Sequence, residues 1–266
     1  QDEALPDPPA LAEQVRLNFQ PQLCCDTGQL AALRVVPFID HPRGGRLTLA
    51  ELQSRLDGRT LAGITRAALR QAMAALRGWD RLGRRIPFVS MQIPDRELAE
   101  SDIADAIMWE LDRLDLAPER LELEVCEPIG CDGGRVPVSE TLQRLAGHGC
   151  RIALGNFGSG SAGLADLRRF GVRRVRIGRE FIAECDRRED QQNMILAVVA
   201  LAEHLRLTTL ADGVDTADEH AFVAQIGFNA VQGRAVAPLL DAGGTDAFLL
   251  EYDQSLPAPY ETRRRG

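Results

Sequence analysis

The sequence predicts an α/β barrel in which parallel strands alternate with helices, and two observations carry this prediction. From Thr48 onward, segments with apolar residues at helical spacing alternate with short apolar runs. A length of 266 residues is also usual for one such barrel. Strands that are joined by helices lie parallel, because right-handed crossovers return the chain to the same edge of the sheet. We therefore expect one TIM-like (β/α)8 barrel, with its site where strands end and loops begin.

Periodicity places the individual elements. Apolar residues recur at helical spacing over residues 103–114 and 194–205. The apolar runs that we predict as strands cover residues 86–93, 121–126, 151–154, 172–177 and 207–211. Before them, runs over residues 17–24 and 30–39 flank a turn sequence of Asp26, Thr27 and Gly28, which predicts a β-hairpin.

The ends of the chain differ from its middle in composition. Residues 1–14 combine several prolines with acidic residues, which is typical of a linker or N-terminal extension. We expect the barrel domain over residues 15–252 and a C-terminal tail over residues 253–266. Since the chain begins with Gln1 rather than Met, we expect it to be cut from a longer protein, whose upstream part can include another domain or a membrane anchor.

Charge and cysteine content limit the functional classes. The net charge of −8 disfavours nucleic-acid binding, which needs a concentrated basic surface, and the three consecutive arginines at 263–265 are the only basic run. All basic residues counted as Lys+Arg are arginines. The 6 cysteines lack the paired spacing of a metal site and the density of a secreted scaffold. Together with the lack of a signal peptide or a long apolar run, this predicts a cytoplasmic domain with reduced thiols.

Two glutamates alternate with apolar residues in one predicted strand. Over residues 121–126, Glu122 and Glu124 share one face and the apolar side chains share the other. A carboxylate that points into a barrel is costly unless it is paired or binds a cation. The strand alone leaves both interpretations open, a salt-bridged glutamate or a metal ligand.

Residues 158–163 spell the G-x-G-x-x-G pattern of dinucleotide-binding loops. Several strand-helix units precede it, however, and the next strand ends in Arg176, Ile177 and Gly178 rather than in an acidic residue. We interpret these glycines as a tight turn between a strand and a helix.

Seven short segments, taken in order, resemble the EAL family of bacterial signalling proteins. They include Phe-Gln-Pro at 19–21, Leu-Glu-Leu-Glu-Val-Cys-Glu at 121–127 and Gly-Asn-Phe-Gly-Ser-Gly at 155–160. Val-Arg-Ile-Gly-Arg at 175–179, Ala-Asp-Gly-Val-Asp-Thr at 211–216 and Val-Gln-Gly at 231–233 follow, and Thr27-Gly28 with His41-Pro42 frames the signature segment. The resemblance covers nearly the whole chain after residue 14. It implies an EAL-type barrel with one antiparallel strand, the first.

In active members, the resemblance implies two divalent cations that are held by carboxylates and an asparagine, with a metal-bound water that attacks cyclic di-GMP. This chain departs from the pattern at five positions. The signature glutamate is Arg34, the asparagine ligand is Ser90, the paired aspartates are Gly155 and Asn156, and the lysine is Arg176. An arginine has no lone pair to offer a cation. We therefore predict that the family's magnesium or manganese site is lost and that no other cofactor replaces it.

Other positions retain the family's pocket. Glu124, Glu127 and Gln232 match it, and Asp212 and Asp215 are one methylene shorter than the family's glutamates. In a chain without lysine, we give the change at Arg176 little weight. The residues that we predict to line a ligand pocket are Gln20, Arg34, Glu124, Arg176, Asp212, Asp215 and Gln232.

These departures predict a barrel that is not an enzyme and acts in cyclic di-GMP signalling as a regulatory protein-interaction scaffold. Arg34 then neutralises Glu124 or Asp212. A second hypothesis is a metal-independent receptor for cyclic di-GMP, in which Arg34 faces a ligand phosphate. Against it, the family's phosphate-binding arginine aligns with Phe38. Weak residual hydrolysis is the third hypothesis, and the partners left open are a regulatory protein, an upstream domain and a second copy.

Overall fold

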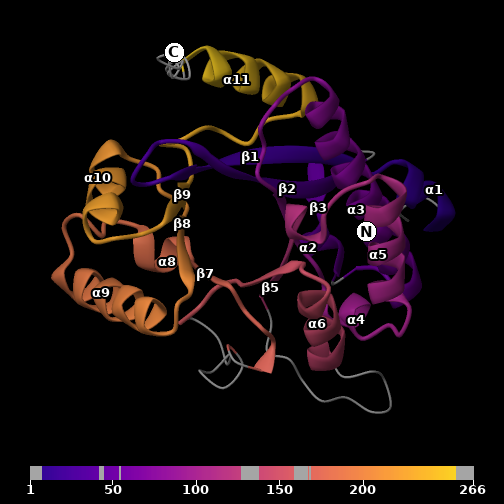
Figure 1. Ribbon diagram of the computed structural model, residues 1–266, viewed down its shortest axis with the longest axis horizontal. Helices are drawn as coiled ribbons and strands as arrows, with labels where there is room; N and C mark the ends of the chain where they lie inside the picture. Colours follow the sequence, from indigo (N-terminus) through magenta and orange to yellow (C-terminus); the bar gives the residue numbers. More distant parts are fainter. Residues whose placement is uncertain are drawn as a thin grey trace, which may run out of the picture.

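The computed structural model describes residues 8–41, 45–53, 55–126, 138–158, 167 and 169–255. Within these residues, eight strands close into a barrel and the described helices lie around it (Figure 1). The barrel strands are β1 (Arg16–Cys24), β2 (Leu30–Asp40), β4 (Val89–Gln92), β5 (Leu121–Val125), β6 (Arg151–Leu154), β7 (Arg174–Ile177), β8 (Thr208–Asp212) and β9 (Ala230–Gln232). A short strand, β3 (Arg46–Thr48), extends the sheet beside β2.

The sheet closes through β1, which is antiparallel to both of its neighbours, β2 and β9. Every other pair within the barrel is parallel. The predicted hairpin is therefore confirmed, and so is the barrel with one antiparallel strand. Gly28, in the hairpin turn, has a φ of +66°, a conformation that glycine adopts without strain.

The helices follow the strands as the spacing of apolar residues predicts. Between β2 and β6 they are α2 (Leu49–Gln53), α3 (Gly58–Arg81), α4 (Asp95–Leu98), α5 (Ile103–Arg113), a 3-10 turn (Pro118–Arg120) and α6 (Val138–Gly147). After β7 come α8 (Arg179–Ile182), α9 (Glu189–His204), α10 (Ala217–Gln225) and α11 (Ala242–Ser255). The helices predicted over residues 103–114 and 194–205 correspond to α5 and to the part of α9 from Met194 onward.

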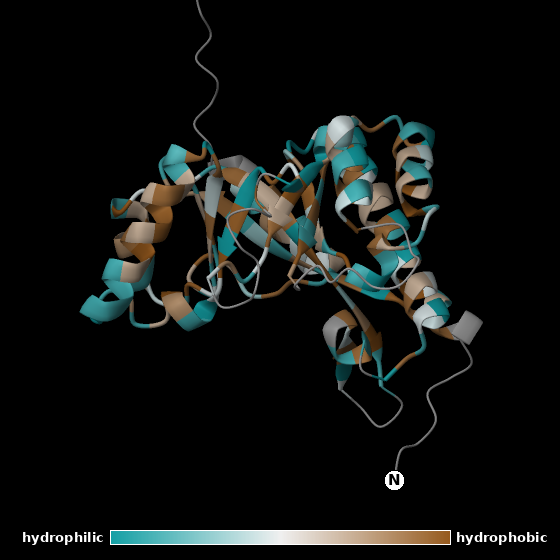
Figure 2. Cartoon of the chain, turned by 90° about the horizontal axis from the view of Figure 1, so that it is seen from below, coloured by the Kyte–Doolittle hydropathy of each residue, from teal (hydrophilic) through white to brown (hydrophobic). Residues whose placement is uncertain are grey.

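The two faces of each strand differ sharply. The outward residues of β5, Leu121, Leu123 and Val125, are buried under the helices as part of one continuous apolar core. Figure 2 shows both apolar and polar residues along the strands of the barrel. The inward residues Glu122 and Glu124 are also buried, so the barrel interior is filled with polar side chains. The functional residues therefore lie inside the barrel.

The predicted linker over residues 1–14 contains a helix, α1 (Pro8–Glu13), which packs against α3. Leu11 on this helix is 1% exposed and belongs to the core. Residues 8–13 of the predicted linker or N-terminal extension thus form a helix that the composition did not indicate, because the segment is too short for one buried leucine to give a periodic signal. At the other end, α11 continues to Ser255, and Asp246 on this helix accepts a hydrogen bond from Trp79 at 2.7 Å.

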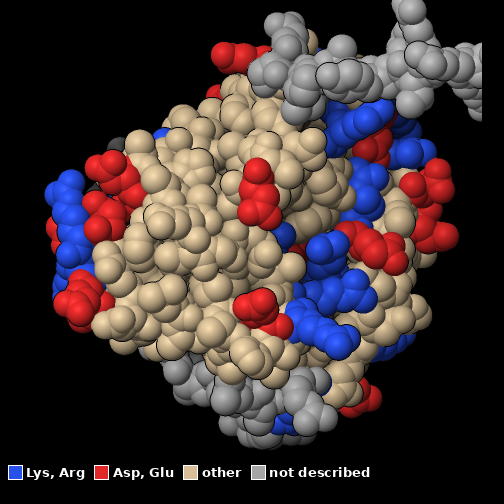
Figure 3. All heavy atoms as spheres, turned by 60° about the vertical axis from the view of Figure 1, so that its left-hand side comes forward, with Lys and Arg blue, Asp and Glu red and all other residues tan. Residues whose placement is uncertain are grey.

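Charged side chains are unevenly distributed on the surface. Figure 3 shows one side of the barrel, on which uncharged side chains cover most of the centre around a few acidic groups, while basic side chains, with acidic ones among them, gather in a band on the right and at the left edge. Exposed arginines precede several parallel strands, among them Arg85 before β4, Arg173 before β7 and Arg206 before β8. No described helix has the length and the apolar character needed to span a membrane.

Candidate functional site

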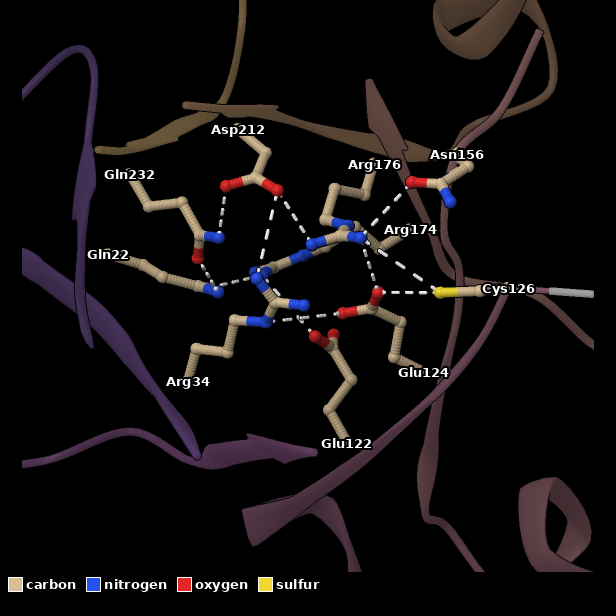
Figure 4. A network of polar contacts seen from close by, with 10 residues as sticks. All are labelled: Gln22, Arg34, Glu122, Glu124, Cys126, Asn156, Arg174, Arg176, Asp212 and Gln232. Carbon is tan, nitrogen blue, oxygen red and sulfur yellow. Dashed lines mark hydrogen bonds and ion pairs between the residues drawn. The ribbon is translucent and has the colours of Figure 1, made fainter. Parts of the chain in front are cut away.

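Two carboxylates and two guanidinium groups meet inside the barrel (Figure 4). Glu124 comes from β5, Asp212 from β8, Arg34 from β2 and Arg176 from β7. All four point inward because each occupies the inward position of its strand. Strands that are far apart in the sequence thus place two negative and two positive side chains in one pocket.

Arg176 is the main partner of both carboxylates. Its Nη1 lies 2.6 Å from Asp212 Oδ2, and its Nη2 lies 2.9 Å from Glu124 Oε1. Nη2 also donates to Asn156 Oδ1 at 3.2 Å. Arg176 is 5% exposed, so these contacts form away from bulk water, where charge-assisted hydrogen bonds are strong.

Arg34 makes longer contacts with the same two carboxylates. Its Nε lies 3.9 Å from Glu124 Oε2, and its Nη1 lies 3.7 Å from Asp212 Oδ2. The expected neutralisation of Glu124 or Asp212 therefore involves both carboxylates. The Arg34 side chain is 18% exposed, and it lines a pocket of about 200 Å³ together with Val36, Leu49 and Gln92.

A chain of amide hydrogen bonds links this pocket to a second ion pair deeper in the barrel. Gln232 donates to Asp212 and accepts a 2.7 Å hydrogen bond from Gln22. The Gln22 Oε1 atom accepts from Arg174 at 2.7 Å, and Arg174 Nη1 lies 3.4 Å from Glu122 Oε1. The network therefore has two layers, which Gln22 and Gln232 connect.

The two buried glutamates respond differently to their surroundings. Burial disfavours the charge of Glu124, but the attraction of Arg176 and Arg34 outweighs it and lowers the pKa of this carboxyl. At Glu122, by contrast, burial dominates, and Arg174 and a hydrogen bond from Ser90 only partly offset it, so the pKa of Glu122 is raised. Glu124 is thus held as a carboxylate by its two arginines.

The raised pKa of Glu122 predicts a pH dependence of stability. Just above the ordinary carboxyl pKa of 4.5, folded Glu122 still holds a proton that the unfolded chain has lost. Because the folded state binds more protons in this window, the contribution of Glu122 to stability falls as the pH rises. Glu122→Gln should remove this contribution. The free energy of unfolding of the variant should therefore increase relative to that of the wild type between pH 4.5 and pH 7. Urea unfolding at each pH measures it, and a constant difference contradicts the prediction.

Of the residues at the other departures from the family pattern, Gly155 and Asn156 lie beside the pair of Glu124 and Arg176, and Ser90 lies in the deeper layer. An ideal Cβ on Gly155 would lie 2.4 Å from Cys126 Sγ and 2.6 Å from Glu124 Oε1, so these two atoms occupy the space of a side chain at position 155. Cys126 Sγ donates to Glu124 Oε1 at 3.0 Å. Asn156 has a φ of +50°, which asparagine tolerates better than most residues. Ser90 is buried beside Glu122.

Two of the predicted pocket residues lie outside the network. Asp215 pairs instead with Arg179 and Arg234, at 3.0 Å and 2.6 Å, and the hydrogen bond from Arg234 contributes most to lowering its pKa. Gln20 is half-buried opposite Arg34 in the β1–β2 pairing, and among the described polar contacts it takes no part in the network. The glutamine that does so is Gln22, two residues later.

Sequence reasoning missed Gln22, Arg174 and Cys126 as members of the network, and it left Glu122, which it placed on the inward face of its strand, out of the predicted pocket. The signal that indicates three of them is alternation, because residues two apart on a strand share a face. Gln22 follows Gln20, Arg174 precedes Arg176 and Glu122 precedes Glu124. The predicted Glu127 and most of the glycine pattern at 158–163 lie outside the described residues.

The described donors do not fit a two-cation centre. Such a centre needs several oxygen ligands that carry negative charge. Glu124 and Asp212 are already ion-paired with two arginines, which contribute as much positive charge as the carboxylates contribute negative charge. Over the described part of the chain, no group of three or more His, Cys, Asp or Glu residues is arranged to hold a metal ion.

The structure is a closed α/β barrel with one antiparallel strand, and residues from most of its strands form a polar interior. This arrangement is that of the EAL-type barrel. The EAL domain model matches residues 4–238, and the chain belongs to the EAL domain family. The bifunctional diguanylate cyclase/cyclic di-GMP phosphodiesterase MucR of Pseudomonas aeruginosa is 26% identical over 83% of this chain. The cyclic di-GMP phosphodiesterase NbdA of the same organism is 27% identical over 90% of it. The chain spans 32% and 31% of these two relatives.

Solved structures agree with this assignment. The MucR phosphodiesterase in complex with cyclic di-GMP has a TM-score of 0.78 at 26% identity, over 87% of this chain and 94% of that one. The EAL enzyme Bd1971 with cAMP and cyclic di-GMP has a TM-score of 0.82 at 19% identity, over 92% and 66%. The second likeness concerns the fold alone.

Proposed function

We propose that this EAL domain does not hydrolyse cyclic di-GMP and acts in cyclic di-GMP signalling as a regulatory protein-interaction scaffold. The observation that supports this most directly is the pairing of Glu124 and Asp212 with Arg34 and Arg176. A guanidinium group repels divalent cations and offers them no lone pair. The four charges balance one another, so the mouth of the barrel keeps its shape without a metal ion.

The missing ligands strengthen the case against hydrolysis. Even changes beside a metal ligand typically cost 10- to 100-fold in metal affinity or activity. Here an arginine, a glycine and an asparagine occupy three positions at which the family has carboxylates. We infer that two cations do not bind together at cellular concentrations.

The activity prediction is direct to test. With excess Mg²⁺ or Mn²⁺, the purified chain should linearise cyclic di-GMP no faster than buffer does. The Arg34→Glu variant should be equally inactive, because positions 155 and 156 still lack carboxylates. MucR provides the positive control. Linearisation above the buffer rate by the wild-type protein contradicts the proposal.

A second candidate function is a metal-independent receptor for cyclic di-GMP. The specific observation in its favour is the position of Arg34, whose long ion pairs and partial exposure beside the 200 Å³ pocket leave it able to approach a ligand phosphate. Against it, Phe38 is buried under the guanidinium group of Arg46, 4.5 Å from the ring centre, where the resemblance places a phosphate-binding arginine. That bidentate clamp on the ligand is absent at position 38.

Calorimetry separates the scaffold from the receptor. Cyclic di-GMP is titrated into the protein with and without Mg²⁺, and into Arg34→Ala as the matched variant. Saturable binding that needs no metal and is lost in Arg34→Ala supports the receptor. No heat of binding up to high micromolar ligand supports the scaffold.

A further inference from the structure

Exposed arginines surround the end of the barrel at which its parallel strands begin, which we call the N-terminal mouth. Arg85 precedes β4, Arg173 precedes β7 and Arg206 precedes β8. All three residues are exposed, and none of them forms an ion pair with another residue that the structure describes. The pocket of Glu124 and Asp212 lies toward the other end, because these residues come at or near the ends of their strands. The arginines therefore form a surface that the candidate site does not use.

Two further arginines lie at the centre of the N-terminal mouth. The guanidinium groups of Arg151 and Arg174 lie 4.4 Å and 4.9 Å from the centre of the Phe88 ring, at distances typical of cation–π contacts. Both groups share one carboxylate, Glu122, at 3.9 Å and 3.4 Å. The Nε atoms of both arginines are buried and have no hydrogen-bond partner among the described residues. A surplus of positive charge follows, and it can be reached from outside because the Arg151 side chain is 29% exposed.

Acidic side chains at this end reduce the positive charge without neutralising it. Asp26 in the β1–β2 turn, Glu119 before β5 and Glu203 near the end of α9 are exposed there. Arg81 at the end of α3 and Arg84 just after it add to the basic side chains. The starts of the strands thus keep an excess of positive charge on a chain whose net charge is −8.

The spacing of the arginines indicates the shape of an anionic partner. Arg173 and Arg206 precede the adjacent strands β7 and β8, whereas Arg85 precedes β4, four steps from β8 in the sheet. Neighbouring strands are about 4.8 Å apart, so these side chains are spread around the mouth rather than gathered at one point. A single compact anion such as phosphate can reach only part of this set. A peptide segment with several carboxylates can reach all of it, and guanidinium groups bind carboxylates in bidentate geometry.

We propose that the N-terminal mouth docks an acidic peptide segment of a protein partner, with carboxylates on Arg85, Arg173 and Arg206 and one at the centre against Arg151. This inference rests on the proposed scaffold function and gives the chemistry of the partner that the scaffold binds. Charge complementarity also limits the partner to a short segment. A long duplex or an anionic membrane would face the negative charge of the rest of the surface, whereas a short acidic segment is attracted to the mouth alone.

Fluorescence anisotropy with a labelled peptide in which glutamate alternates with serine tests the proposal. The peptide should bind the wild-type protein saturably, and its affinity should fall by about tenfold or more when NaCl is raised from about 50 to 300 mM, because salt screens exposed charges. The same peptide with glutamine in place of glutamate should not bind.

Paired substitutions locate the surface. Arg173→Gln combined with Arg206→Asn removes two exposed charges and should weaken binding by about tenfold. Asparagine suits position 206 because φ is +57° there, a conformation that asparagine tolerates better than most residues. Arg70→Gln is the matched control, since Arg70 on α3 is also exposed and has no ion pair among the residues described; its affinity should equal that of the wild type. Far-UV circular dichroism verifies that each variant is folded.

Three results would overturn the proposal: no saturable binding of the glutamate peptide, unchanged affinity in the double variant, or an equal loss in Arg70→Gln. Tighter binding of duplex DNA or of vesicles that contain anionic lipid would also overturn it, by assigning the mouth to a different class of partner. These results are independent of the hydrolysis assay. Linearisation of cyclic di-GMP by a protein that still binds the peptide would overturn the proposed function and leave the docking surface in place, whereas an inactive protein without peptide binding would overturn the docking surface alone.

Discussion

Replacing Arg176 by methionine should lower the free energy of unfolding by about 3 to 5 kcal/mol, the usual effect of removing one partner from a buried ion pair. The Arg176 side chain is 6% exposed and is the nearest cation to both Glu124 and Asp212. Without it, Arg34, at 3.7 and 3.9 Å, would be the one cation still paired with these two carboxylates among the described residues. Urea unfolding at pH 7 measures the change.

An exposed pair provides the control for this prediction. Arg234 is 74% exposed and pairs with Asp215, so Arg234→Met should lower the free energy of unfolding much less than Arg176→Met does. If the loss in Arg176→Met comes from unpaired carboxylates, then adding Glu124→Gln and Asp212→Asn should restore part of the stability. A loss at Arg176 no larger than that at Arg234 contradicts the account of the network.

Gly155→Asp should destabilise the fold rather than rebuild a metal site. Its Cβ would lie 2.4 Å from Cys126 Sγ and 2.6 Å from Glu124 Oε1, and Glu124 cannot move away without breaking its 2.9 Å pair with Arg176. Overpacking of this kind costs about 1 to 3 kcal/mol, which Gly155→Ala measures by itself. The aspartate adds repulsion with Glu124, so we expect its cost to exceed that of the alanine.

Two comparisons test whether a steric clash causes the expected loss of stability at position 155. Gly78 lies in α3 with open space around an added Cβ, so Gly78→Ala should stabilise the protein by about 0.5 to 1 kcal/mol. Cys126→Ala removes one of the two obstructing atoms, so Gly155→Ala should cost less in that background. Equal costs in both backgrounds would show that the contact with Cys126 is not the cause.

The predictions for Arg176 and Gly155 together indicate what it would take to build a metal site in this pocket. Cys126 and Glu124 fill the space that a side chain at position 155 would need, and Arg34 and Arg176 already balance the charges of Glu124 and Asp212. Restoring one ligand at a time therefore meets either a steric or an electrostatic barrier. We expect reconstruction of a metal site to need several simultaneous substitutions.

Much of the fold follows from the sequence because it depends on local pattern. The alternation of Glu122 and Glu124 with apolar residues sets which side chains point inward, and the hairpin follows from a turn sequence between two apolar runs. The helix of residues 8–13 was missed because a single turn that is anchored by Leu11 has no periodicity to detect. Its burial depends on α3, more than 40 residues away.

For the candidate site too, some features follow from the sequence and others only from the tertiary structure. By itself, the sequence determined the residue types of the pocket and the two arginines that it contains, since strand alternation and the family resemblance are properties of short segments. Only the tertiary structure decided that Arg176, rather than Arg34, is the close partner of both carboxylates, that Gln22 rather than Gln20 continues the network, and that Asp215 pairs elsewhere. The reason is physical: ion pairs and hydrogen bonds are sensitive to differences of a few tenths of an ångström in the distances between side chains, and for strands far apart in the chain those distances are set by the register and closure of the barrel.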